Sequence, residues 1–379
     1  MRKIKDFFLL TFHNLNVLIL ILFYLSLSAV VFFTLYKLIV SGLESKNLNS
    51  ERLKTETHFK YNWSEQYFED ENNLKGEYRP IIGFKEKKFS SENINVDEDG
   101  CRVSRNNSLK NPDVIFLGGS TMFGYGSNDL NTIPSLFSEI LNDTLTVRNL
   151  GNGSHNSTQS LLKFYDLILD GTKPKYVISY EGVNEMLDLL VEKEINTNLF
   201  HSFADYFRQI IDKNFTPKKV LSFKSIFTDY TNSIRKFIFL VLRKIGVIKY
   251  RTLDDLHSAE DLKIEKSVKI LLENWKLISL ISKEKGIKCF LYLQPHLFSN
   301  KHKNDYLKKF DFLEKYYTKL YPMIIKKINS DPDYDLVREN FYDLSRSLDD
   351  KNAYFYDYCH LNPLGNKIIS EKIIRTIFQ

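Results

Sequence analysis

The chain is predicted to fold as an α/β protein in which helices cover both faces of a mostly parallel sheet. Short apolar runs alternate with amphipathic helical segments from about residue 81 to the C-terminus. This alternation is typical of parallel sheets, because parallel strands must be joined by a crossover that is usually a helix. The composition agrees with a folded globular chain, since 43% of the 379 residues are hydrophobic and 26% are charged.

Four strands and four helices are expected in this alternation. The predicted strands are residues 113–117, 144–150, 175–180 and 287–293, and the predicted helices are 133–141, 157–169, 267–286 and 366–378. Gly286 is a usual helix stop, and the apolar side chains of the last helix recur with helical spacing. Ligands of such sheets bind beyond the carboxyl ends of the strands, so functional residues are expected at that edge.

The first 40 residues are predicted to form a cytoplasmic tip followed by a transmembrane anchor. No Asp, Glu, Lys or Arg occurs from Phe7 through Tyr36, and residues 17–36 form an apolar run of 20 residues. A helix of about 20 such residues spans the hydrocarbon core of a bilayer. A cleaved signal peptide has a shorter apolar region of roughly 7–15 residues, so an uncleaved anchor is the favoured interpretation.

The basic residues that flank this run do not agree on its orientation. Arg2, Lys3 and Lys5 favour an N-terminus inside the cell, but four basic residues follow the run: Lys37, Lys46, Arg52 and Lys54. We expect the tip inside and the large domain on the extracytoplasmic side. Residues 41–80 are polar and charged and are expected to form a juxtamembrane stalk, with the main domain at 81–379.

One long segment, at about 187–260, interrupts the alternation and is predicted to be a helical insert. Within it, residues 217–250 combine eight Lys or Arg with one Asp and many large apolar side chains. Two interpretations stay open. The segment is either a basic amphipathic stretch that lies on a membrane surface, or a set of helices in a cap subdomain whose charged face is solvated.

Charge and cysteine content exclude several classes of function. The net charge of +6 is spread among nearly as many acids as bases, without a basic block, so nucleic acid is not an expected partner. Cys101, Cys289 and Cys359 form no C-x-x-C pair, so neither a zinc site nor a disulfide framework is indicated. No phosphate loop or dinucleotide fingerprint occurs, and we expect neither a metal nor an organic cofactor.

Ser120, in "FLGGSTMFGYG" (116–126), is the candidate nucleophile. It directly follows the first predicted strand, and the preceding Gly118 and Gly119 would let the backbone turn sharply and let a substrate approach. A serine hydroxyl is a weak nucleophile and needs an adjacent base that is oriented by a third group. The alternative is that Ser120 only caps the helix after it, which is a common use of serine.

His360 and Asp357 are the candidate base and its orienting group. They lie three residues apart in the loop before the last helix, where one turn of chain can place a carboxylate against Nδ1–H of the imidazole. Nε2 is then free to take the serine proton. Of the other seven histidines, His155 and His296 follow predicted strands and stay open as candidate bases.

Two further strand ends offer donors for an oxyanion, the negative charge that acyl transfer builds on the carbonyl oxygen. Asn184 follows the third strand and carries a side-chain amide. The loop 149–157 follows the second strand and offers backbone N–H groups, with Gly153 and Ser154 at its centre. Turn formation by Gly and Asn is the alternative explanation for both segments.

Taken together, these segments resemble the SGNH/GDSL hydrolase superfamily over about 90–190 and 286–379. "GGST" matches the block with the catalytic serine, "GVNE" (182–185) matches G-x-N-D, and "DYCH" (357–360) matches D-x-x-H. The resemblance implies a flavodoxin-like α/β/α sandwich and a triad of Ser120, His360 and Asp357. It also implies an oxyanion hole formed by the Ser120 N–H, an N–H of the second block and the Asn184 amide.

Three positions depart from the family pattern. Gly119 replaces the aspartate of G-D-S, Glu185 replaces the aspartate of G-x-N-D, and Ser154 stands where the second glycine of N-x-G-x-x-G is expected, with Gly153 one residue early. A backbone donor could still serve at Ser154 if the loop keeps the family's shape.

The sequence therefore predicts a membrane-anchored serine esterase that hydrolyses O-acetyl or other short acyl esters on an envelope glycan or a lipid-linked substrate. An O-acyltransferase that uses the same residues to modify surface polysaccharide is the alternative. A third possibility is an envelope scaffold in which the fold has lost its activity, because folds host unrelated functions.

Overall fold

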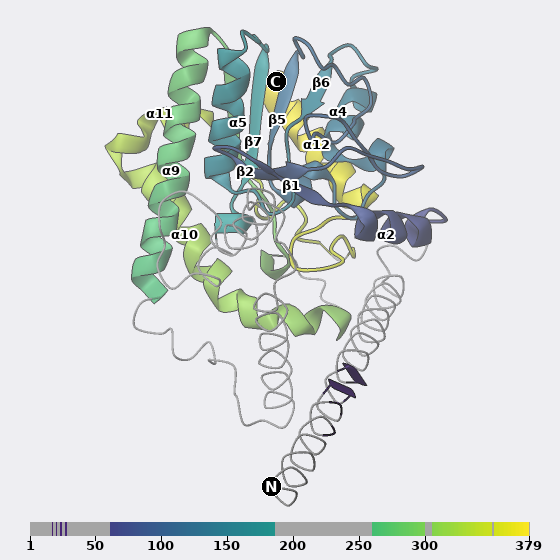
Figure 1. Cartoon of the computed structure of the whole chain (residues 1–379). Coiled ribbons are helices and arrows are strands. Elements are labelled where there is room, and N and C mark those ends of the chain that lie inside the picture. The colour runs from purple at the N-terminus through teal and green to yellow at the C-terminus, as the bar shows by residue number, and fades with distance from the viewer. Residues whose placement is uncertain are drawn as a thin grey trace, which may run out of the picture. The chain divides into compact units, whose positions relative to one another are not determined.

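The computed structural model describes residues 61–185, 260–299, 305–350 and 352–378, and six helical positions near the N-terminus: Val17, Leu20, Phe23, Tyr24, Leu27 and Ser28. The chain forms two compact units, one of residues 1–51 with 217–252 and one of residues 52–216 with 253–379. The six N-terminal positions are all that is described of the first unit. The second unit holds the α/β domain (Figure 1).

A five-stranded parallel sheet forms the centre of this domain. Its strands are β5 (Val114–Gly118), β6 (Val147–Asn149), β7 (Tyr176–Glu181), β8 (Lys288–Leu293) and β9 (Phe341–Asp343), in the spatial order β6-β5-β7-β8-β9. All four pairings are parallel. Numbered within the sheet, this order is 2-1-3-4-5, which is that of flavodoxin-like sheets and places a crevice beside the first strand.

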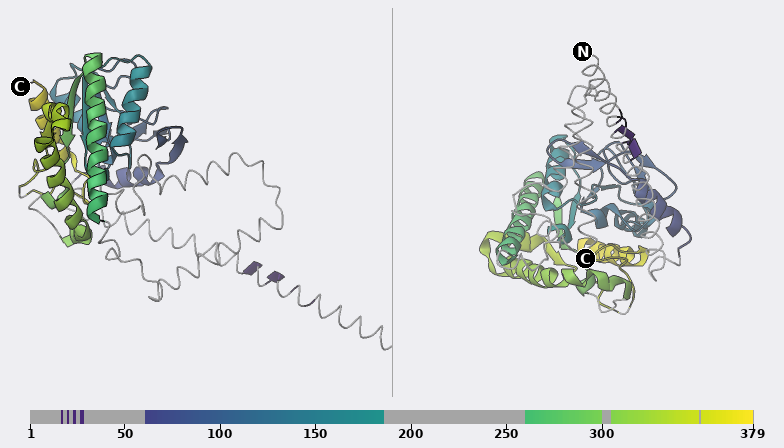
Figure 2. Two further views of the ribbon diagram at one scale, coloured as in Figure 1. Left: turned by 90° about the vertical axis from the view of Figure 1, so that its left-hand side faces the viewer. Right: turned by 60° about the horizontal axis from the view of Figure 1, so that its bottom comes forward.

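Helices cover both faces of the sheet (Figures 1 and 2). One face carries α5 (Ser157–Leu169), α9 (Glu260–Lys285), α10 (Glu314–Ser330) and α11 (Asp335–Asn340), and the other carries α4 (Ile133–Ile140) and α12 (Pro363–Phe378). Alternate residues of the strands enter the two cores: Ile115 and Leu117 of β5 pack on the α5 and α9 side, and Val114 and Phe116 on the α4 and α12 side. The sheet is therefore buried on both faces, as its apolar strands predict.

The predicted elements agree closely with those observed in the α/β domain. Helix α5 has its predicted bounds, and the four predicted strands differ by a few residues at their ends, most of all β6, which is shorter than 144–150. Helices α9 and α12 begin earlier than predicted, at Glu260 and Pro363. Strand β9 and helix α10 are not among the predicted elements. A three-residue edge strand has too little apolar length to be recognised.

Part of the predicted stalk packs on the α/β domain. Helix α2 (Ser64–Asn73) buries Tyr67 and Phe68 in a small core with Phe123 and Tyr356. It is followed by an antiparallel ribbon of β1 (Gly76–Arg79) and β2 (Gly83–Glu86) and by a short one of β3 (Phe89–Ser90) and β4 (Asn95–Val96). The domain boundary thus lies before the expected residue 81.

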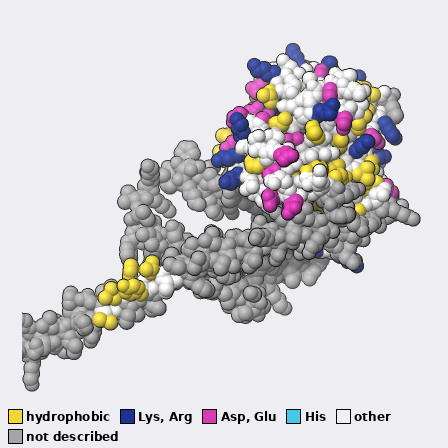
Figure 3. Space-filling view, turned by 90° about the vertical axis from the view of Figure 1, so that its right-hand side faces the viewer, with side chains coloured by type: hydrophobic (Ala, Val, Ile, Leu, Met, Phe, Trp, Pro, Cys, Tyr) yellow, Lys and Arg dark blue, Asp and Glu magenta, His cyan; other side chains and the backbone are white. Residues whose placement is uncertain are grey.

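Short 3₁₀ helices complete the described elements: η1 (Asp129–Asn131), η3 (Leu297–Ser299), η4 (Asp305–Leu313) and η5 (Pro332–Tyr334). Helix α3 (Ser120–Phe123) follows β5 directly. On the face of the domain shown in Figure 3, Lys and Arg are interspersed with Asp and Glu.

Two predicted segments fall outside the described residues. The insert at 187–260 does so apart from Glu260, and the apolar run 17–36 does so apart from the six positions named above. Among the described residues, no helix combines the length and hydropathy needed to cross a bilayer. The anchor and the insert therefore stay predictions.

Candidate active site

Ser120 lies at the carboxyl end of β5, as the first residue of α3. The residue before this helix is Gly119, which makes no side-chain cap, and the Ser120 hydroxyl lies 2.7 Å from Nε2 of His360. Its side chain is therefore used in a contact with an imidazole and does not cap the helix. Ser120 is 8% exposed, so it is largely shielded from solvent.

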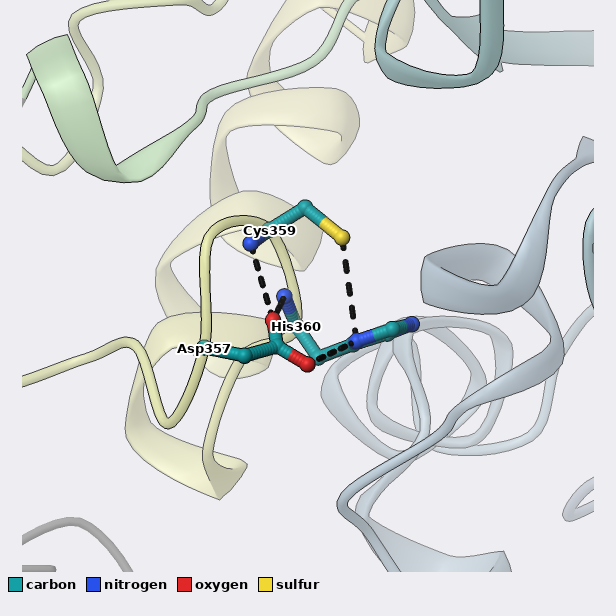
Figure 4. Close-up of side chains that lie close together, drawn as sticks. All are labelled: Asp357, Cys359 and His360. Atoms are coloured by element: carbon teal, nitrogen blue, oxygen red, sulfur yellow. Dashed lines mark hydrogen bonds and ion pairs between the residues drawn. The ribbon is translucent and has the colours of Figure 1, made fainter. Parts of the chain in front are cut away.

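His360 and Asp357 form the second link of this hydrogen-bonded chain. Nδ1 of His360 lies 2.6 Å from Oδ2 of Asp357, and Nε2 points away from the carboxylate (Figure 4). The carboxylate can only accept, so Nδ1 carries the proton and Nε2 is the acceptor for the Ser120 hydroxyl. Ser120, His360 and Asp357 are thus arranged as a nucleophile, a base and an orienting carboxylate require.

Asp357 is held by its own loop in an ionised state. Its Oδ1 accepts the backbone N–H groups of Cys359, at 2.9 Å, and of His360, at 2.8 Å (Figure 4). Burial by itself would raise the pKa of the Asp357 carboxyl, but the charge and hydrogen bond of His360, with those two N–H groups, lower that pKa to about 2. The carboxylate is therefore charged at neutral pH.

Aromatic rings fix the plane of the His360 imidazole. Tyr356 stacks on it with a centroid distance of 5.5 Å and an interplanar angle of 21°, and Tyr125 lies 5.6 Å away at 38°. Tyr358 approaches at 6.4 Å. The ring is thus restrained by packing as well as by its two hydrogen bonds, which favours one rotamer of the candidate base.

Cys359 also lies beside this pair, with Sγ 3.7 Å from Nδ1 of His360. Asp357, Cys359 and His360 offer ligand atoms within 4.8 Å of one another. However, the 2.6 Å between Nδ1 and Oδ2 is the distance of a charge-assisted hydrogen bond. Two ligands that each lie about 2.0–2.2 Å from a tetrahedral zinc ion are farther apart than that. The cluster is therefore arranged as a hydrogen-bonded pair.

Asn184 lies against the backbone next to Ser120. A Cβ added at Gly119 would come 2.2 Å from Nδ2 of Asn184, so only glycine permits this close approach. The Asn184 amide donates to the backbone carbonyl of His155 at 2.6 Å and is 6% exposed. Gly119, in the place of the family's aspartate, has no side chain in the space that the Asn184 amide occupies.

The loop after β6 holds Gly153 and Ser154 in the shape that the family's glycine would favour. Ser154 has φ +59°, in the left-handed region where glycine is the usual residue. A Cβ at Gly153 would lie 2.7 Å from the Tyr125 hydroxyl, which explains a glycine at this position. Within the described part of the chain, the N–H groups of Gly153 and Ser154 have no hydrogen-bond partner.

Glu185, in the place of the family's aspartate, ties two strand ends together. One of its carboxylate oxygens accepts the Ser157 N–H at 2.7 Å and the other accepts the Gly182 N–H at 3.0 Å. Glu181 lies nearby and accepts a hydrogen bond from the Ser160 hydroxyl. Burial and the charge of Glu185 raise the pKa of Glu181 well above its usual range. Both acids have structural partners.

The other two candidate bases lie away from Ser120. His155 is fully buried, and its Nε2 contacts the Phe84 carbonyl at 3.0 Å. The ring of His296 stacks on Tyr317 at 4.6 Å and lines a cavity of about 690 Å³ beyond β8 and β9. The structure therefore brings only His360, among the described histidines, to the Ser120 hydroxyl. The hydrogen bond that His155 makes to β2 has no signal in the sequence.

A comparison with models of protein families finds one match. The model of the GDSL-like lipase/acylhydrolase family matches residues 114–373, which is more than half of the chain and includes Ser120, Asn184, Asp357 and His360. The chain belongs to the GDSL-like lipase/acylhydrolase family. It is therefore a hydrolase that acts on ester bonds. A comparison with curated protein sequences finds no match.

A comparison with solved structures finds matches of low sequence identity, and two of those described below are named as esterases. An acetyl xylan esterase is 15% identical over 70% of this chain and 99% of its own, with a TM-score of 0.35. A member of the lipolytic G-D-S-L family from Veillonella parvula is 9% identical over 70% and 98%, with a TM-score of 0.41. A carbohydrate acetylesterase family member from Sinorhizobium meliloti is 12% identical over 70% and 97%, with a TM-score of 0.34.

Proposed function

We propose that this GDSL-family hydrolase is a serine esterase that removes O-acetyl or other short acyl groups from a glycan or a lipid-linked substrate of the cell envelope. The main support for the proposal is a continuous chain of two hydrogen bonds. The Ser120 hydroxyl lies 2.7 Å from Nε2 of His360, and Nδ1 of His360 lies 2.6 Å from Oδ2 of Asp357. A working serine nucleophile requires such a chain, and an inactive scaffold does not.

In the proposed first half-reaction, the Ser120 oxygen attacks the ester carbonyl while Nε2 of His360 takes the hydroxyl proton. The negative charge moves to the carbonyl oxygen, which accepts hydrogen bonds from the Ser120 N–H, the Asn184 amide and an N–H of the 153–154 loop. The tetrahedral intermediate collapses when the C–O bond to the alcohol breaks and His360 gives its proton to the departing oxygen. Ser120 then carries the acyl group as an ester.

In the second half-reaction, water takes the place of the alcohol. His360 removes a proton from the water, the hydroxyl oxygen attacks the acyl carbon, and His360 returns the proton to Ser120 as the acid leaves. A sugar hydroxyl can take the place of water in this step. Transfer of the acyl group to a glycan is therefore the alternative outcome at the same site.

The envelope location in this proposal comes from the sequence. The run 17–36 has the length and composition of a membrane-spanning helix, and a domain held by it on the extracytoplasmic side would meet acylated surface glycans.

Three measurements test the proposal. A fluorophosphonate probe should label the protein at Ser120, and Ser120→Ala should lose both the label and the hydrolysis of 4-nitrophenyl acetate. Unchanged hydrolysis by Ser120→Ala would refute the nucleophile, and a folded wild-type protein without label would favour the scaffold. Incubation with an activated acyl ester and candidate glycans then separates hydrolysis, which releases only acid, from transfer, which gives an acylated sugar.

A further inference from the structure

Strand β2 contacts the site although it lies upstream of the family-matched residues 114–373. The carbonyl of Phe84, on β2, lies 3.0 Å from Nε2 of His155, and the two rings meet edge to face with centroids 4.8 Å apart. His155 belongs to the loop after β6, directly after Ser154. The ribbon of β1 and β2 is thus attached to the loop that offers backbone donors to an oxyanion.

The His155 imidazole has one defined state in this contact. A carbonyl oxygen can only accept, so Nε2 carries the proton and donates it to Phe84. The side chain is fully buried. Burial, with the positive charge of Lys163, holds the pKa of His155 well below its usual range, so the ring is neutral.

The backbone of the same residue holds Asn184. The His155 carbonyl lies 2.6 Å from the Asn184 amide, and because a carbonyl can only accept, the atom that faces it is the nitrogen. This contact uses one of the two amide hydrogens and leaves the other for a ligand. The nitrogen lies beside Gly119, where an added Cβ would come within 2.2 Å of it and within 3.0 Å of the His155 carbonyl.

We propose that His155 is a positioning residue through which strand β2 holds the Asn184 amide in the oxyanion site. This inference rests on the proposed function and adds a part to it: the ribbon 76–86 belongs to the catalytic centre. The side chain of His155 fixes the loop to Phe84, and its backbone carbonyl fixes the orientation of the Asn184 amide. His155 itself does not touch the reacting atoms.

The test is a double-mutant cycle of His155→Leu and Asn184→Ala, measured with 4-nitrophenyl acetate on the detergent-solubilised full chain. Removal of one oxyanion donor costs about 10²–10³ in kcat, so misplacement of that donor by His155→Leu should lower kcat by about tenfold or more. KM should change by less than about twofold, since the amide acts mainly on the transition state. In the Asn184→Ala background, His155→Leu should cost clearly less kcat than in the wild type, because the part of its effect that passes through Asn184 is already lost.

Two matched variants separate positioning from loss of stability. His155→Gln keeps a donor at similar reach to the Phe84 carbonyl and should recover most of the wild-type kcat. Ile373→Val, in the core on the α12 side, loses stability without touching the loop and should leave kcat unchanged. Equal losses from His155→Leu in both backgrounds, or a wild-type kcat in His155→Leu, would overturn the proposal.

A readout without catalysis keeps this inference separate from the proposed function. The side-chain ¹⁵N–¹H signals of Asn184, assigned by their absence in Asn184→Ala, should shift in His155→Leu and stay near the wild-type position in His155→Gln. Unshifted signals in a folded His155→Leu protein would refute the positioning role. If the proposed function were wrong, Ser120→Ala would hydrolyse the ester at the wild-type rate. That result would leave the expected shifts of the Asn184 signals unchanged, so the two failures can be told apart.

Discussion

Replacement of Asp357 by Asn should nearly stop the reaction, because it moves the proton of the His360 imidazole from Nδ1 to Nε2. Oδ1 of Asp357 accepts two backbone N–H groups, so the oxygen of an asparagine amide must take that place. The amide NH₂ group then occupies the position of Oδ2, 2.6 Å from Nδ1 of His360. Because NH₂ can only donate, Nδ1 must accept and the imidazole proton must move to Nε2. A protonated Nε2 cannot take the proton of Ser120.

The expected loss in kcat is about 10⁴, the factor by which the same wrong tautomer slows a serine protease. At about 1.36 kcal/mol for each factor of ten, this corresponds to about 5 kcal/mol of transition-state stabilisation. Asp357→Ala is the informative comparison. It removes the orienting carboxylate but leaves no donor against Nδ1, so the imidazole can still carry its proton there. We therefore expect Asp357→Ala to be at least as active as Asp357→Asn.

The same substitution should change the stability of the protein in acid. A pKa of about 2 for Asp357, against its ordinary value of 3.8, means that the carboxylate stabilises the fold above about pH 4. This contribution is about 2 kcal/mol and is lost as the pH falls through the folded pKa. In Asp357→Asn the corresponding acid-linked loss should be absent from unfolding curves recorded between pH 5 and 2.

Initial rates with 4-nitrophenyl acetate and thermal unfolding at neutral pH give the two readouts. Asp357→Asn should keep the fold, since the oxygen that accepts both backbone N–H groups remains, whereas Asp357→Ala should lose more stability. An Asp357→Asn enzyme with a rate near the wild type would refute the assigned tautomer, and with it the role of Asp357 as the orienting group. A rate for Asp357→Asn well above that of Asp357→Ala would do the same.

Three further predictions follow from contacts around the site. Gly119→Ala places a methyl group 2.2 Å from the Asn184 nitrogen, so kcat should fall by about 100-fold; an unchanged kcat in a folded variant would contradict the close approach. Ser154→Gly removes the free-energy cost of holding a non-glycine residue at φ +59°, so the free energy of unfolding should rise by about 1 kcal/mol. The value of kcat should stay within about twofold of the wild type. Urea titration measures the first change and initial rates measure the second. Glu181→Gln should gain stability relative to the wild type as the pH rises from 5 to 8, because the raised pKa of Glu181 makes its ionisation unfavourable in the fold; parallel stability curves would argue against this.

The sequence alone predicted most of the α/β architecture. The alternation of buried strands and amphipathic helices gave the layers and the edge where ligands bind, because burial on both faces requires apolar strands of this length. The same reasoning placed Ser120, Asn184 and the loop 149–157 at neighbouring strand ends. The contact between Asp357 and His360 could be predicted from their spacing alone, because both lie in one loop. The family match over 114–373 agrees with the resemblance that these segments indicated.

Local sequence patterns alone do not predict the contacts that cross the domain. The bond between β2 and His155 joins residues 71 apart and is not expected. The bond between His360 and Ser120 joins residues 240 apart, and it is expected only from the needs of a serine nucleophile and from the family resemblance. Local patterns record the period of a helix or a strand and the chemistry of a turn, but they do not record which distant backbone will face a given side chain.

The departures from the family pattern also show what the sequence predicts and what only the fold decides. In the sequence, Gly119 and Ser154 are substitutions at expected positions. Only the fold shows that Gly119 makes room for the Asn184 amide and that Ser154 keeps the left-handed backbone of a glycine. Residue type and spacing determine which groups are available for chemistry. Tertiary packing decides which of them meet, because distances of 2.6 or 2.7 Å depend on elements far apart in the chain.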